Sequence, residues 1–151
     1  MKALPKIFFL ALAVLVLTVP TADAAKLVNT GFGKTAIKGY DTVAYFTQGA
    51  PVKGSKEFKH KWNGATWRFS SAENLELFKA NPAKYAPQYG GWCAFAMALG
   101  KKVKIDPKAW HIHEDKLYLN YTPATQDLWL GDKEAKISDA NVEWQGILSK
   151  N

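Results

Sequence analysis

Apolar and polar residues alternate along residues 58–69, with a turn signal at the centre. Asn63-Gly64 is the pair that a two-residue type I′ turn prefers, because both central positions need positive φ. The alternation predicts a β-hairpin with an aromatic face in the core and a face bearing lysines in solvent. The expected cross-strand pairs are Phe58 with Phe69, His60 with Trp67, and Trp62 with Ala65.

A second alternation covers residues 110–121 and predicts another hairpin, turning at Glu114-Asp115. Because successive side chains of a strand point to opposite sides, its residues separate into two faces. The apolar face holds Trp110, Ile112, Leu117, Leu119 and Tyr121. The opposite face holds His111, His113, Tyr118 and Asn120.

Helix signals follow each hairpin. Ser70 with Glu73 three residues later resembles a capping box, and Asn81-Pro82 ends that helix. Thr122-Pro123 has the N-cap and first-turn proline of a helix that runs to Gly131. Further helices are expected over 91–99 and 138–148, and a short buried strand over 43–46. The pattern predicts an α+β fold: a small single domain of two β-hairpins packed with about four short helices.

The N-terminus has the pattern of a secretory signal peptide over residues 1–24. Lys2 and Lys6 precede an apolar run over 7–19, and Ala22-Asp23-Ala24 is a small-x-small cleavage site. The run is shorter than the roughly 20 residues of a membrane-spanning helix. We expect a periplasmic or secreted protein with no membrane span after cleavage, a flexible lead-in over 25–36 and the folded domain over 37–149.

The charge distribution argues against nucleic acid as a partner. The 151-residue chain has a net charge of +7, and Arg68 is its only arginine. Nucleic-acid sites draw on the planar fork of arginine for phosphate and guanine contacts, and the lysines here are scattered. Motifs of hydrolases and nucleotide-binding enzymes are absent from the sequence, so we expect a protein without enzymatic activity.

The stretch from Phe58 to Tyr85 closely resembles the YHS domain. The resemblance is carried by the Asn-Gly turn between aromatic strands and by the ending Asn81-Pro82-Ala83-Lys84-Tyr85. Residues 39–46 also resemble the entry strand of the family. Residues 87–121, with Tyr89-Gly90-Gly91-Trp92-Cys93-Ala94, are similar to the longer exported bacterial form, which includes selenoproteins.

The resemblance implies metal handling, because short YHS domains are thought to bind metals beside copper and heavy-metal transporters. The positions at which those domains have cysteines correspond here to Ala44, Ser70 and Asn74. None of these residues offers the thiolate that Cu(I) or Zn²⁺ favours. The resemblance therefore carries over the fold, and any metal site must use other residues.

Cys93 is the only cysteine, and the expected helix over 91–99 would place it in the first turn. There the helix dipole would favour the thiolate, as a metal ligand or as a redox nucleophile. The alternative is that Cys93 fills space in an apolar helix. With no second cysteine, an intramolecular dithiol cycle is excluded.

The three histidines are the other candidate ligands. His111 and His113 lie two apart on one strand, so their imidazoles share a face and suit Cu(II), Zn²⁺ or Ni²⁺. The alternative is a polar strand face with exposed histidines. His60 lies among aromatic residues, as a core histidine or as a partner of Cys93.

These observations give one leading hypothesis and two alternatives. The first is an exported YHS-type protein that binds a transition-metal ion (copper or zinc) or a small ligand, using Cys93, His60, His111 and His113. The second is a thiol redox protein with Cys93 as its nucleophile. The third is a protein-interaction domain that uses its aromatic-rich face and has no site chemistry.

Overall fold

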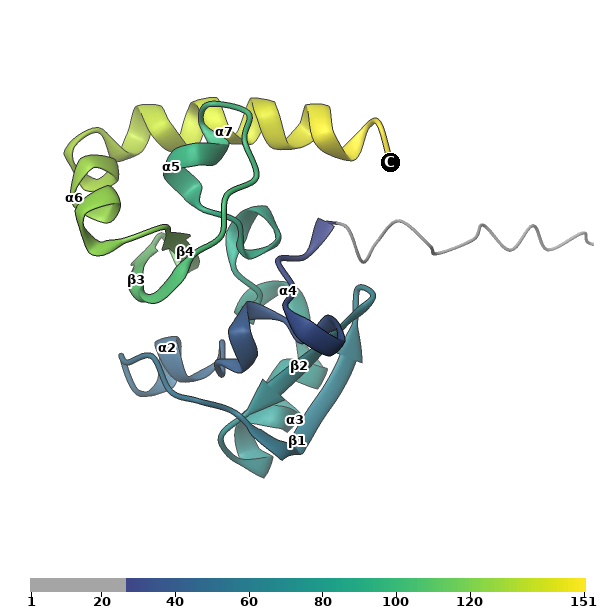
Figure 1. The fold of residues 1–151 in the computed structure, drawn as a ribbon. Coiled ribbons are helices and arrows are strands. Elements are labelled where there is room, and N and C mark those ends of the chain that lie inside the picture. The colour runs from purple at the N-terminus through teal and green to yellow at the C-terminus, as the bar shows by residue number, and fades with distance from the viewer. Residues whose placement is uncertain (1–26) are drawn as a thin grey trace, which may run out of the picture.

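The computed structural model describes residues 27–151, shown in Figure 1. The expected signal peptide, residues 1–24, lies outside the described residues. Two antiparallel two-stranded sheets, β1–β2 and β3–β4, pack with short helices, which confirms the predicted α+β class. In chain order the elements are η1 (Phe32–Lys34), η2 (Ile37–Gly39), α2 (Ala44–Thr47), β1 (Ser55–Trp62), β2 (Ala65–Phe69), α3 (Ala72–Ala80), α4 (Pro82–Tyr85), η3 (Gln88–Gly91), α5 (Ala94–Met97), β3 (Asp106–His113), β4 (Lys116–Asn120), α6 (Pro123–Gly131) and α7 (Lys133–Leu148).

The first hairpin has the predicted turn, and its register agrees with the prediction near that turn. Asn63 and Gly64 have φ values of 51° and 70°, and Trp62 pairs with Ala65. At the far end the register differs, because the pairing is irregular between Ser55 and Lys59. Phe69 therefore pairs with Ser55 rather than with Phe58.

The second hairpin also agrees with its prediction. The pairs run from Trp110 with Leu119 to His113 with Lys116, and Glu114-Asp115 forms the turn. Both faces of this hairpin are covered, however, since Tyr118 and Asn120 of the supposedly polar face are buried. That face packs toward α5 and α6 rather than facing solvent.

Three sequence-predicted elements are wrong in kind or extent. Ala44, Tyr45 and Phe46 lie in α2, and Val43 is its N-cap, so residues 43–46 do not form a strand. The helix expected over 91–99 shrinks to α5, because Tyr89, Gly90 and Gly91 have positive φ and cannot begin a helix. The last helix begins at Lys133, six residues ahead of the expected Asp139 start after Ser138.

The caps of the remaining helices are mostly as predicted. Thr122 caps α6 by accepting a hydrogen bond from the Thr125 N–H (3.1 Å). In α3, by contrast, the cap is Ser71, whose Oγ accepts from the Asn74 N–H (3.1 Å). The hydroxyl of the neighbouring Ser70 instead donates a hydrogen bond to Oδ2 of Asp41 (2.7 Å).

The expected flexible lead-in is packed where the structure describes it. Val28 and Ala36 are buried. The Asn29 N–H donates to the Gly90 carbonyl (2.8 Å), and the Ala36 N–H donates to the Thr66 carbonyl of β2 (2.9 Å). The small polar residues of this segment gave no sign of this packing, because the hydrogen bonds that hold it come from backbone groups and not from side chains. We call residues 27–29 the N-terminal strap.

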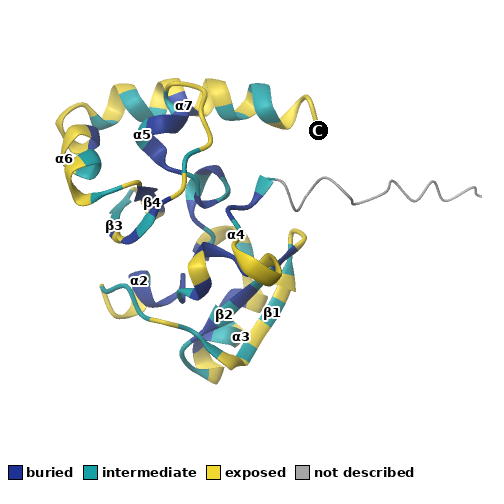
Figure 2. Ribbon diagram, viewed as in Figure 1, coloured by how far each residue is buried: buried dark blue, intermediate teal, exposed yellow. Residues whose placement is uncertain are grey.

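Buried residues occur in both hairpins and in the helices around them (Figure 2), and their side chains form two clusters. The first extends from the first hairpin and α3, where Phe78 packs on Trp67 and Phe69 at centroid distances of 5.1 Å and 4.9 Å, to Leu117 and Leu119 of β4. The second lies under α7, where Trp129 packs on Tyr118 at 5.1 Å. Among the helices of residues 27–151, none is long and apolar enough to cross a membrane.

Candidate functional site

Asp41 is a fully buried carboxylate that accepts five hydrogen bonds. Its Oδ1 accepts from the backbone N–H groups of Val43 (2.9 Å) and Ala44 (3.2 Å), which explains why a helix starts here. Its Oδ2 accepts from the Ser70 N–H (2.8 Å), the Ser70 hydroxyl (2.7 Å) and the Asn74 amide (2.7 Å). The carboxylate thereby joins α2, the end of β2 and α3.

The three residues that stand at the expected cysteine positions of the family, Ala44, Ser70 and Asn74, all contact Asp41. The fold therefore does bring these positions together. In this chain they supply N–H and O–H donors to a carboxylate whose acceptor sites are occupied, and such a set has no group left for a cation. A metal ion does not fit this cluster, which instead holds three elements together.

Cys93 lies in the core, 1 % exposed. It precedes α5 rather than lying in its first turn, and α5 has only four residues, so the expected dipole effect on the thiol has no structural basis. Its Sγ lies 3.8 Å from Oδ1 of Asn120, and its N–H donates to the Val103 carbonyl (3.0 Å). The space-filling interpretation of Cys93 agrees best with this burial.

His60 is half-buried on the aromatic face of the first hairpin, as the register predicted. Its ring meets that of Phe78 edge-on, with 6.4 Å between centroids. It belongs to the packing of β1 on α3.

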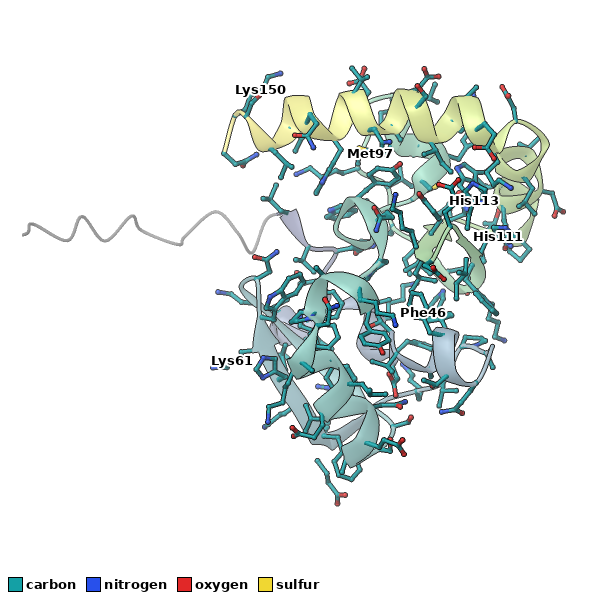
Figure 3. The ribbon with its side chains drawn as sticks, turned by 180° about the vertical axis from the view of Figure 1, so that it is seen from behind. Phe46, Lys61, Met97, His111, His113 and Lys150 are labelled. Atoms are coloured by element: carbon teal, nitrogen blue, oxygen red, sulfur yellow. The ribbon has the colours of Figure 1, made fainter. Side chains whose placement is uncertain are left out.

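His111 and His113 emerge from the same face of β3, next to α6 and the start of α7 (Figure 3). Nε2 of His113 lies 3.2 Å from Oε1 of Glu134, and the ring of His111 meets that of Trp129 edge-on at 5.9 Å. Burial, followed by the charges of Lys133 and His113, lowers the pKa of His111. His111 is thus neutral at neutral pH, the form in which imidazole binds metals.

The four predicted ligands are not assembled into one site. Within residues 27–151, no group of three or more His, Cys, Asp or Glu side chains is placed to hold a metal ion. His111 and His113 share a strand face, while Cys93 and His60 belong to the core and to the first hairpin. Sequence spacing could place only the first pair, because the others depend on tertiary packing.

A hollow in the described part of the chain was missed by the sequence analysis. It has a volume of about 310 Å³ and lies between the first hairpin, α4, η3, the N-terminal strap and the end of α7. Its lining is Leu27, Val28, Trp62, Asn63, Trp67, Ala83, Ala86, Pro87, Gln88, Tyr89, Gly90, Trp144 and Leu148. We call it the aromatic pocket, after its three tryptophans and one tyrosine.

Hydrogen bonds fix the aromatic rings of this pocket. Nε1 of Trp67 donates to the Trp62 carbonyl (2.9 Å), and the Tyr89 hydroxyl lies 3.0 Å from Oδ1 of Asn141 in α7. Burial, and secondarily Tyr118, raises the pKa of Tyr89, so its hydroxyl keeps its proton. The indole of Trp67 and the phenol of Tyr89 are thus held in place before any ligand arrives.

Tyr89 itself has an unusual backbone, with a φ of 57°, and Gly90 follows at 63°. Positive φ in a bulky residue is uncommon and is maintained only by surrounding contacts. The N-terminal strap supplies these contacts here. Nε1 of Trp92 donates to the Leu27 carbonyl (3.1 Å), and the same carbonyl lies against Gly90. The Tyr89-Gly90-Gly91 run, visible in the sequence, is a signal that could have pointed toward this region.

These features define a small α+β domain with an aromatic pocket and, in its described residues, no assembled metal centre. Residues 43–89 match the family model of the YHS domain. The chain therefore carries a YHS domain, as the resemblance predicted. Comparison with curated proteins and with solved structures found no match.

The family match covers only part of the pocket lining. Residues 43–89 supply most of its wall, from Trp62 to Tyr89. The strap and the end of α7, with Trp144 and Leu148, lie outside the match and close it. The pocket thus forms where the YHS domain meets the rest of this chain.

Proposed function

We propose that this chain is an exported, non-enzymatic YHS-domain protein that binds a small, uncharged and largely aromatic ligand in the aromatic pocket. The observation that carries the proposal is the pocket itself, about 310 Å³ in volume and lined by four aromatic side chains. Small-molecule sites begin at roughly 300 Å³ and are lined mainly by apolar and aromatic groups.

The chemistry of the lining selects the ligand class. In the part of the pocket that the structure describes, no side chain carries a charge, and the polar side chains are the amides of Asn63 and Gln88 and the indole and phenol groups. An ionised ligand would lose its hydration there without a partner of opposite charge. A flat, neutral ligand stacks on tryptophan rings at low cost and makes hydrogen bonds to the amides.

Filling the pocket from its rim tests the proposal. The probe is N-phenyl-1-naphthylamine, a neutral planar dye, titrated into protein purified after export with its N-terminus at Ala25 confirmed by mass. Ala83 lines the pocket and is exposed, and Ala83→Trp adds an indole there without removing a core side chain. We expect fluorescence enhancement with the natural chain and an affinity at least about tenfold weaker for Ala83→Trp.

The matched control is Ala124→Trp, which adds the same indole to an exposed position of α6 outside the pocket. It should bind the dye like the natural chain. The pocket would be contradicted as a ligand site if the natural chain showed no saturable dye binding. It would also be contradicted if Ala83→Trp and Ala124→Trp bound the dye with equal affinity.

A transition-metal ion is the second candidate ligand, and the surroundings of His113 favour it. Nε2 of His113 is buried without a hydrogen bond, 3.2 Å from a Glu134 carboxylate oxygen and on the face that also bears His111. Two imidazoles and a carboxylate are ligands that zinc and copper accept, although here they would have to move closer.

Native mass spectrometry separates this candidate from the first. If a metal is the ligand, titration with copper or zinc gives one ion per chain that survives desalting and is lost in His113→Ala. The control His60→Ala, at the first hairpin, should keep the ion. Weak adducts of variable number would exclude the metal candidate and leave dye binding unaffected.

A further inference from the structure

The outer face of the first hairpin carries a concentration of positive charge that neither the pocket nor the histidines use. Lys59 stands directly across from Arg68, and Lys61 across from Thr66, on the side of the sheet that faces away from α3. Figure 3 shows Lys61 on the outer side of β1. Like charges opposite each other destabilise a hairpin, so this pairing calls for an explanation.

Printed contacts extend this face beyond the two strands. Arg68 Nη2 donates to Oγ1 of Thr35 (3.3 Å), which brings the segment 34–39 onto the same side. Lys34 and Lys61 line one open hollow, and Lys53 Nζ donates to the Lys38 carbonyl (2.9 Å). We call this set the basic face: Lys34, Lys38, Lys53, Lys59, Lys61 and Arg68.

The basic face is not neutralised by neighbouring carboxylates. Among the residues that the structure describes, no ion pair includes any of its six cations. Glu57 is the acidic residue of the same strand, at the irregular end of the hairpin. Five of the six cations are exposed, so their charge is available to a partner.

A completely exposed aromatic ring lies beside this face. Phe32, between Gly31 and Gly33, has an exposed fraction of 103 %, so its ring has no packing partner in the described part of the chain. It belongs to η1, whose Gly33 and Lys34 line the hollow that Lys61 and the hairpin turn also line. An apolar ring held in water beside cations is a feature of surfaces that contact a membrane interface.

We propose that the basic face docks this protein on an anionic lipid bilayer, with Phe32 inserting at the headgroup boundary. Anionic lipid headgroups attract clustered lysines through charge alone and need no fixed geometry. A nucleic acid would favour arginine forks and several stacking rings, and this face offers one arginine and one ring. The docking face is separate from the aromatic pocket and does not depend on its ligand.

Vesicle sedimentation with the processed chain tests this assignment. We expect binding to vesicles of phosphatidylcholine mixed with phosphatidylglycerol, little binding to phosphatidylcholine alone, and release as salt rises from about 0.05 M to about 0.5 M. The double variant K59Q/K61Q should bind the anionic vesicles at least about tenfold more weakly than the natural chain. Phe32→Ala should weaken binding at equal charge.

The matched control, K108Q/K116Q, removes two exposed lysines from the second hairpin and should keep most of the affinity. Circular dichroism verifies that the variants are folded, which the exposure of all five side chains favours. Equal losses in the two double variants would show that net charge alone acts and would overturn the proposal. Absent binding to anionic vesicles would also overturn it, as would tighter binding to a single-stranded oligonucleotide than to vesicles.

Discussion

Asp41→Asn is expected to lower the free energy of unfolding by about 3–5 kcal/mol. An amide oxygen can still accept from Val43 and Ala44, but the amide nitrogen then faces the Ser70 N–H and the Asn74 amide, which are donors. Hydrogen bonds to a charged acceptor each contribute about 1.5–3 kcal/mol, and buried donors without an acceptor add their desolvation cost. Urea unfolding followed by circular dichroism measures the loss.

Asp139→Asn provides the control for this substitution. Asp139 is exposed on α7, so the same change of atoms there should alter stability by less than about 0.5 kcal/mol. A similar small effect for Asp41→Asn would show that the carboxylate does not hold α2, β2 and α3 together. Because those elements surround the first core cluster, a large effect would show that this cluster depends on the Asp41 carboxylate.

Gly90→Ala is expected to destabilise the protein by about 2–4 kcal/mol and to abolish dye binding in the aromatic pocket. An added Cβ would lie 1.9 Å from the Leu27 carbonyl oxygen, and Gly90 has a φ of 63°. The strap must move away, which breaks its bonds to Gly90 and Trp92. Thermal unfolding and the dye titration report the two effects.

The control is Gly146→Ala in α7, where an added Cβ meets nothing within 4 Å. A helical glycine replaced by alanine should stabilise the chain by about 0.5–1 kcal/mol. Dye binding that survives in Gly90→Ala would show that the strap is not needed to close the pocket.

Local signals predicted those parts of the fold that local chemistry determines. The Asn63-Gly64 turn and the Thr122-Pro123 helix start are correct, because turn geometry and capping act over a few residues. The strand predicted at 43–46 was wrong, because the Asp41 carboxylate accepts hydrogen bonds from the N–H groups at the start of a helix there. The apolar residues of this helix have the pattern of a short buried strand. Ser70 was also wrongly predicted as the cap of the next helix, because its hydroxyl donates to the Asp41 carboxylate.

The candidate site was harder to predict than the fold. The pocket combines side chains from residue 27 to residue 148, and no spacing rule connects positions so far apart. Its aromatic residues were visible in the sequence, but core tryptophans and pocket tryptophans look alike there. Cys93 is the only cysteine, and its burial argues against the metal or redox role that a first-turn position would favour.

The two hairpin turns differ in how strongly local sequence favours them, which leads us to expect an order in which they form. Asn63-Gly64 adopts its turn readily, so the first hairpin closes from local preference. Glu114 and Asp115 have φ values of 47° and 56°, and this left-handed backbone is less favourable for a glutamate than for asparagine or glycine. We therefore expect the first hairpin to form before the second during folding, because the second depends on distant contacts such as the hydrogen bond from the Tyr45 hydroxyl of α2 to the Pro107 carbonyl (2.8 Å).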